Sequence, residues 1–225
     1  MTDKPKNVPI QEAFSFGWKK FSQDTLVWIG VVLLMGVLSS VVSYLLRDTS
    51  GVYYNNIASF LVNTLIAISV TTLALRVYNG KRAEYKDLFS NLKPYGNFLL
   101  TSILTSLLAG LSILIYAIII AYVPISAALT FPLGLAAIIT AVIILIRYQF
   151  ATTSVLDHSF KPLQAMKYSA KLTDGTKGKL FVFDCLALLI IIISLIPFFL
   201  GLLVAIPVVW LAQVYVYKKL VEQAK

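Results

Sequence analysis

Residues 98–148 read FLLTSILTSLLAGLSILIYAIIIAYVPISAALTFPLGLAAIITAVIILIRY, and this apolar stretch decides the fold of the chain. A single helix of this length would measure about 76 Å at 1.5 Å per residue, whereas the hydrocarbon core of a bilayer is about 30 Å thick. The stretch must therefore fold back on itself, and Pro124, Pro132 and Gly134 mark the expected reversal. The two expected membrane-spanning helices are 98–122 and 129–148.

The composition agrees with a membrane environment for the whole chain of 225 residues. Hydrophobic residues make up 59% and charged residues 13%, against roughly 25% charged residues in a soluble domain. Two further blocks, 25–46 and 185–217, carry no charge. A transmembrane barrel needs alternating apolar and polar residues, and the run 188–193 (LLIIII) does not alternate. We therefore predict one all-α, polytopic membrane domain over residues 1–225.

The remaining spans follow from the same apolar pattern. The first apolar run is longer than the apolar region of a signal peptide, and Arg47-Asp48-Thr49 follows it in place of a small-residue cleavage site, so we expect it to be retained. Two further spans share residues 180–217, with a reversal at Pro197–Gly201. The expected total is six transmembrane helices, which pair into three hairpins. The four spans outside 98–148 are 25–46, 57–76 and two within 180–217.

Each hairpin follows a segment with helical amphipathic spacing, which is typical of a helix lying in the membrane interface. The apolar faces are Ile10, Phe14, Gly17, Trp18 and Phe21; then Tyr85, Leu88, Phe89 and Leu92; then Leu163, Met166 and Ala170. Pro162 suits the first turn of the third segment, and Gly175 suits its end. The plan predicts three internal repeats, at 10–78, 85–150 and 160–217, although three unrelated hairpins flanked by tyrosines would look similar.

The basic residues determine the expected orientation. All but Arg47 of the 19 Lys and Arg residues fall on one side of this six-span topology. The positive-inside rule then places both termini in the cytoplasm. The net charge of +9 is explained by contact with anionic lipid headgroups, and a nucleic-acid partner is not expected.

Asp184 is the one acid inside a predicted span, and an ionisable group in a membrane is a candidate functional site. Its expected partner is Arg147, near the cytoplasmic end of the neighbouring span. A proton- or ion-coupled site or a gate is one interpretation. The preferred interpretation is a structural salt bridge that joins the two helices.

Three further polar residues are candidates for the same intramembrane site. Arg76 and Gln213 would complete a polar ring with Asp184 if the repeats are real, whereas simple snorkelling of Arg76 is the alternative. Asn63 would either line a pathway or hydrogen-bond to a neighbouring helix.

One histidine, His158, and one cysteine, Cys185, exclude a disulfide within the chain and an ordinary His/Cys metal cluster. We expect no catalytic, cofactor or metal site.

The last third of the chain carries motifs that resemble a known family. They are RYQF at 147–150 with VLD at 155–157, FKPLQAMKYS at 160–169, and GLLVAIP at 201–207 with AQVY at 212–215. These resemble the uncharacterised bacterial integral-membrane family of YciC-type inner-membrane proteins and the membrane domain of glycerophosphoryl diester phosphodiesterases. The resemblance implies a six-helix bundle in the bacterial inner membrane. It implies no enzymatic activity, because catalysis in the phosphodiesterase-linked members belongs to a separate soluble domain.

The functional prediction is a non-enzymatic structural or accessory membrane module that acts on lipid or on a partner protein. The alternative is a small transporter or channel with Asp184 and Arg147 in its pathway. A water-accessible cavity that reaches Asp184 between the helices favours transport, and a dry core with Asp184 paired to Arg147 favours the structural role.

Overall fold

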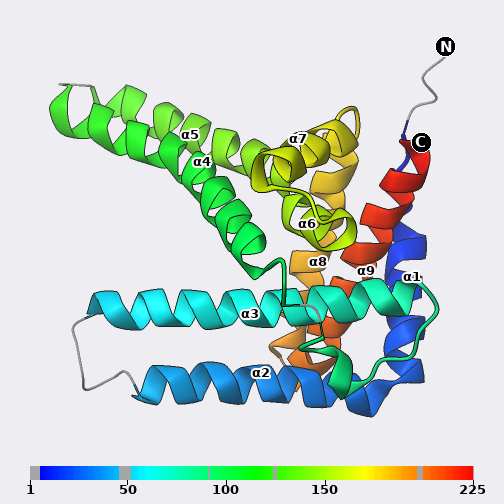
Figure 1. Cartoon of the computed structure of the whole chain (residues 1–225). Coiled ribbons are helices and arrows are strands. Elements are labelled where there is room, and N and C mark those ends of the chain that lie inside the picture. Colours follow the sequence, from blue (N-terminus) through cyan, green and yellow to red (C-terminus); the bar gives the residue numbers. More distant parts are fainter. Residues whose placement is uncertain (1–5, 46–51, 91, 124–125, 197–199, 225) are drawn as a thin grey trace.

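The computed structural model describes residues 6–45, 52–90, 92–123, 126–196 and 200–224, and all regular secondary structure in these residues is helical (Figure 1). The elements are α1 Ile10–Gln23, α2 Thr25–Leu45, α3 Val52–Tyr78, the short 3-10 helix η1 Tyr85–Asp87, α4 Tyr95–Tyr122, α5 Ala127–Tyr148, α6 Ala151–His158, α7 Pro162–Thr173, α8 Lys177–Ser194 and α9 Leu202–Gln223.

Five segments of the described chain are long and apolar enough to cross a membrane, so the prediction of several apolar membrane-type helices is confirmed. They are Thr25–Leu45, Asn56–Tyr78, Tyr95–Tyr122, Leu129–His158 and Leu202–Gln223. The sixth predicted span corresponds to α8, which has 18 residues and carries Lys177, Lys179 and Asp184. The exact six-span arrangement therefore stays a prediction.

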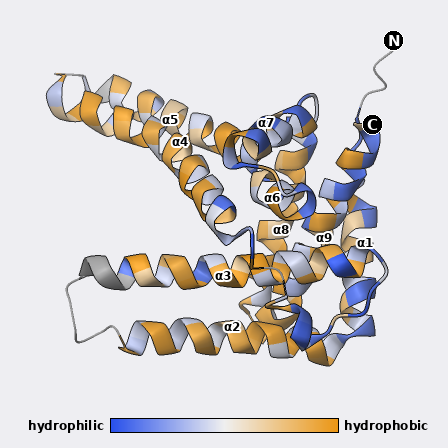
Figure 2. Ribbon diagram, viewed as in Figure 1, coloured by the Kyte–Doolittle hydropathy of each residue, from blue (hydrophilic) through white to orange (hydrophobic). Residues whose placement is uncertain are grey.

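Two helical hairpins, α2–α3 and α4–α5, extend in diverging directions from a common base (Figure 1). Most of their residues are hydrophobic (Figure 2), and many of their large hydrophobic side chains are exposed. The predicted turn around Arg47, Pro124, and residues 197–199 of the last reversal lie outside the described residues. Pro132 and Gly134 were wrongly assigned to a reversal, because both lie inside α5. Membrane helices tolerate such a proline, since neighbouring groups satisfy the freed backbone carbonyl.

The amphipathic segments have different outcomes. The first forms α1, and its face of Ala13, Gly17 and Phe21 is buried, chiefly by packing on α9. The third forms α7, which begins at Pro162 as predicted. The prediction that the second segment forms an amphipathic helix is wrong.

Among the described residues of that second segment, the only helical turn is the 3-10 helix η1, Tyr85–Asp87. The Ser90 hydroxyl donates a 2.7 Å hydrogen bond to the backbone oxygen of Asp87. Local hydrogen bonds of this kind compete with helix formation. The Asp87 carboxylate is in turn paired with Arg76, which holds the segment against α3. The chain has one helix that was not predicted, α6, which follows α5 after a break at Gln149 and Phe150.

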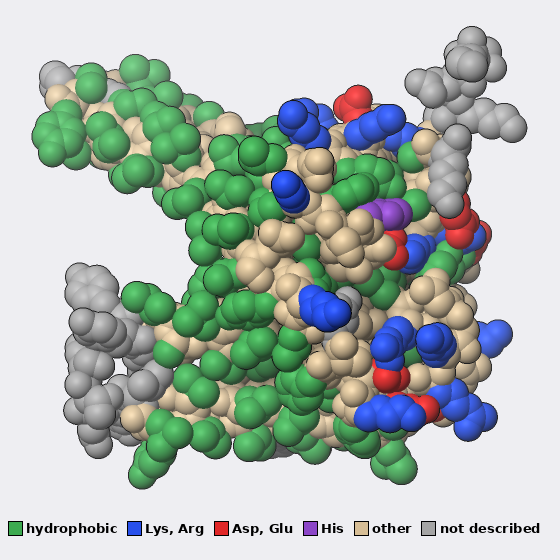
Figure 3. Space-filling view, viewed as in Figure 1, with side chains coloured by type: hydrophobic (Ala, Val, Ile, Leu, Met, Phe, Trp, Pro, Cys, Tyr) green, Lys and Arg blue, Asp and Glu red, His purple; other side chains and the backbone are tan. Residues whose placement is uncertain are grey.

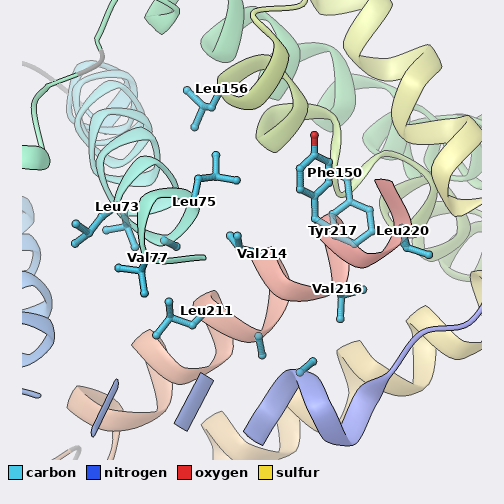
Figure 4. Close-up of a cluster of buried hydrophobic side chains, with 14 of the residues drawn as sticks. Leu73, Leu75, Val77, Phe150, Leu156, Leu211, Val214, Val216, Tyr217 and Leu220 are labelled. Carbon is cyan, nitrogen blue, oxygen red and sulfur yellow. The ribbon is translucent and has the colours of Figure 1, made fainter. Parts of the chain in front are cut away.

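The core lies at the base of the hairpins (Figure 4). Leu73, Leu75 and Val77 from α3 meet a larger set from α9, and Phe150 and Leu156 complete the cluster. The α9 members are Leu211, Val214, Val216, Tyr217 and Leu220. Packing at this one place joins helices that are far apart in the sequence.

Residues near the two ends of the chain lie together at this base. The Asn7 N–H donates to Gln223 Oε1 at 2.7 Å, and Gln223 Nε2 donates to the Asn7 backbone oxygen at 2.9 Å. Lys and Arg side chains gather at the same end of the visible face, whereas hydrophobic side chains cover the hairpins (Figure 3). The side of the membrane on which this end lies stays a prediction.

Candidate functional site

A groove of about 530 Å³ lies between α4, α5, α6 and α8, and Asp184 is one of its lining residues. The full lining is Ser102, Thr105, Ser106, Val142, Leu145, Ile146, Tyr148, Gln149, Thr152, Phe181, Asp184, Cys185 and Leu188. The hydroxyl residues of α4 recur at i, i+3 and i+4, which places them on one face of that helix. The groove therefore combines a polar group of side chains with apolar walls.

Asp184 has no ion-pair or hydrogen-bond partner for its side chain among the described residues. The predicted salt bridge with Arg147 is not formed. Arg147 is exposed, and its guanidinium carbon lies 5.9 Å from the ring centre of Tyr148. Leu145 and Gln149 are four residues apart and line the groove, whereas Arg147 lies midway between them and so points away from it.

Arg147 contributes to the fold through its backbone. Its carbonyl oxygen accepts hydrogen bonds from Ser169 Oγ at 2.9 Å and Thr173 Oγ1 at 3.2 Å. Both donors belong to α7. This carbonyl is near the end of α5, where intrahelical donors run out. Arg147 is therefore a docking point for α7.

Two buried polar atoms of the groove-lining residues also have no hydrogen-bond partner: Thr105 Oγ1 and Gln149 Nε2. Most buried polar atoms in proteins are hydrogen-bonded, and each unsatisfied one costs roughly 1–3 kcal/mol. With Asp184, the groove holds three side chains whose polar groups find no partner within the described chain. This concentration distinguishes the groove from a well-satisfied helix packing contact.

Polar and apolar residues are interspersed along the groove. Ser102 and Asp184 each lie seven residues after the first residue of their helices, α4 and α8, which is about 10 Å along each axis. Gln149 lies just past the end of α5. Val142 lies six residues before that end, about 9 Å along the α5 axis, whereas Thr105 lies ten residues after the start of α4, about 15 Å along its axis. The unpartnered polar groups of the groove are therefore surrounded by apolar walls.

The other predicted site residues lie elsewhere. Arg76 is ion-paired with Asp87, and Gln213 is a partly exposed residue of α9. Neither lines the groove, so the predicted polar ring around Asp184 is not formed. Asn63 Oδ1 accepts a 3.2 Å hydrogen bond from Ser39 Oγ, which is the helix-to-helix bond that the sequence led us to expect.

His158 belongs to a second polar cluster, centred on Asp157. The Asp157 carboxylate accepts hydrogen bonds from Tyr217 OH at 3.1 Å and Lys218 Nζ at 2.5 Å, and His158 Nε2 lies 3.3 Å from it. Burial raises the pKa of Tyr168, and the Asp157 charge raises it further. The His158 ring stacks on Phe160 with centroids 5.1 Å apart. These contacts join α6 to α9 and give the cluster a structural role.

Sequence reasoning found Asp184 but missed the polar residues around it. The spacing of Ser102, Thr105 and Ser106 was a usable signal for a polar face on α4. Gln149 carried no signal, because its position depends on where α5 ends.

Within the described residues, no group of three His, Cys, Asp or Glu side chains lies together in a way that would hold a metal ion. No family model, curated protein or solved structure matches this chain.

Proposed function

We propose that this protein is a non-enzymatic, multi-pass membrane module that binds membrane lipid in the groove between α4, α5 and α8. The observation that carries the proposal is the presence of unpartnered polar groups among apolar walls in one groove. This polarity matches an amphiphile, which has a polar headgroup and apolar chains. Membership in the YciC-type family, which we propose on the motifs of the last third of the chain, agrees with a non-enzymatic membrane protein.

The groove is open to the acyl chains of the surrounding bilayer. Phe181 and Leu188 of α8 line the groove and are 49% and 57% exposed. Exposed apolar side chains on membrane helices contact acyl chains, because no water is present in the bilayer core. A lipid tail can therefore enter sideways from the bilayer.

We infer that Asp184 lies close enough to the membrane interface to meet a lipid headgroup. Asp184 lies about 10 Å along α8 from Lys177, and long lysine side chains near helix ends extend to the interface. With both termini in the cytoplasm, the headgroup would belong to the cytoplasmic leaflet. A bacterial inner membrane is the proposed location.

The single cysteine of the chain provides the test, because Cys185 is exposed and lines the groove. Purified protein in detergent is titrated with phospholipid, and the rate of Cys185 alkylation by a maleimide is measured. We expect the rate to fall several-fold and to saturate with lipid concentration. The matched control is Ser90→Cys in a Cys185→Ser background, whose reporter lies outside the groove and should show no such protection. Equal effects on both cysteines would contradict a lipid site.

A small transporter or channel is the second candidate, because the groove reaches Asp184. Arg147 is not part of that groove, so only Asp184 remains of the predicted pathway pair. Reconstituted wild type and Asp184→Asn are compared in a flux assay. Flux that is lost in a folded Asp184→Asn protein would support transport and overturn the accessory role.

A further inference from the structure

We propose that the groove selects a phospholipid with a primary-amine headgroup, whose ammonium group binds the Asp184 carboxylate. This inference rests on the proposed lipid-binding function and names the ligand class. Two properties of the groove favour such a ligand: its uncompensated negative charge and the direction of its hydrogen bonds.

The described residues supply no cation to Asp184. None of the groove-lining residues is Lys, Arg or His. Among the lysines of α8, Lys177 lines an adjoining apolar cavity that shares Phe181 with the groove, and Lys179 Nζ donates a 2.7 Å hydrogen bond to Asn7 Oδ1. The negative charge of Asp184 is therefore open to a cation from outside the chain.

The site gains from such a cation because Asp184 is partly buried in an apolar helix. A carboxylate removed from water is costly unless it is paired, and this holds most strongly within a membrane. A ligand ammonium entering the groove supplies the missing charge and a charge-assisted hydrogen bond. An anionic headgroup would add to the uncompensated charge.

The polar atoms of Ser102 and Asp184 favour a headgroup that donates hydrogen bonds. Ser102 Oγ donates to the Phe98 backbone oxygen at 3.0 Å, so its single proton is used and its oxygen is left to accept. The Asp184 carboxylate accepts only. A primary ammonium has three N–H donors and can satisfy both. A quaternary choline carries the same charge without an N–H group, so it satisfies the charge alone.

Gln149 can bind the phosphate of such a headgroup. Its Nε2 is a donor without a partner, and a phosphate oxygen accepts this kind of bond. In an aminophospholipid the phosphate is separated from the ammonium by only two carbons. The groove therefore offers an acceptor set for the amine and a donor for the adjacent phosphate.

The experiment compares three phospholipids with identical acyl chains, bearing ethanolamine, choline or glycerol headgroups. Each is titrated into the full-length protein in detergent, and half-protecting concentrations are measured from Cys185 alkylation. Ratios between lipids within one variant cancel any change in the intrinsic reactivity of Cys185. We expect the order ethanolamine, choline, glycerol, with about a tenfold span in the wild type, as for one hydrogen bond to a charged group.

Asp184→Asn should abolish this preference, whereas Asp174→Asn, which removes an exposed carboxylate outside the groove, should keep it. Asp184→Glu keeps the charge and should retain most of the preference. If Asp184→Asn does not fold, the ratios of half-protecting lipid concentrations in the wild type still decide the question. Equal protection by the three lipids in the wild type would overturn amine selection while supporting a lipid groove. Absence of saturable protection by any lipid would sink the proposed function as well.

Discussion

The close approach of α1 to α9 makes Gly17 the most sensitive position in the amphipathic helix. A Cβ atom on Gly17 would lie well under 3.0 Å from the carbonyl oxygen of Val208 and 3.3 Å from Val208 Cγ1. The obstructing oxygen belongs to the α9 backbone and cannot rotate away. Gly17→Ala therefore requires α1 to move away from α9.

The size of the effect follows from two opposing contributions. Forcing one extra methyl group into a close-packed contact costs typically about 1–3 kcal/mol. Alanine gains about 1 kcal/mol over glycine in helix propensity. Because the obstruction is backbone, we place the cost at Gly17 in the upper part of that range, at about 2–3 kcal/mol. We therefore expect a net loss of about 1–2 kcal/mol in the docking of α1, which raises the undocked population about 5- to 30-fold.

Limited trypsin digestion measures this population, because Lys19 is an exposed residue of α1. When opening is fast relative to cleavage, the cleavage rate follows the population of the open form. Gly17→Ala should therefore be cut within α1 about 5- to 30-fold faster than wild type.

The matched control is Gly110→Ala in α4, where an added Cβ would meet no atom within 4 Å. This control gains the same helix propensity without the clash, so its cleavage within α1 should equal that of wild type. Unchanged cleavage of Gly17→Ala would refute the tight α1–α9 contact.

Three further outcomes are expected. Tyr217→Phe removes the hydroxyl that donates to Asp157 and should lower the free energy of unfolding by about 1.5–3 kcal/mol, measured by denaturant titration in detergent micelles. Asn63→Ala removes the bond between α2 and α3 and should cost only about 0.6 kcal/mol, the average for such bonds in membranes; a loss near that of Tyr217→Phe would contradict the assignment. Cysteines at positions Ser50 and Ser90, in a background lacking the native cysteine, should label from opposite sides of the membrane, and same-side labelling would contradict the six-span topology.

The elements that sequence reasoning predicted well are those governed by local composition. Apolar length predicted the start of α2 at Thr25, and Pro162 predicted the start of α7. The second amphipathic segment failed, because its apolar spacing says nothing of Arg76, which pairs with Asp87 from outside the segment. Spacing identified which residues share a helical face, and distant contacts determined whether the helix formed.

The candidate site shows the same division. The sequence by itself determined that Asp184 is a charge inside an apolar helix, because hydropathy is a local property of consecutive residues. Only the tertiary structure decided what surrounds that charge. The rotation of α5 turns Arg147 away and Gln149 toward the groove, and a shift of two residues on a helix reverses the facing side. Such rotation depends on packing between helices, which cannot be read from any one stretch of the sequence. As a result, Asp184 faces an open polar groove where a salt bridge with Arg147 was predicted.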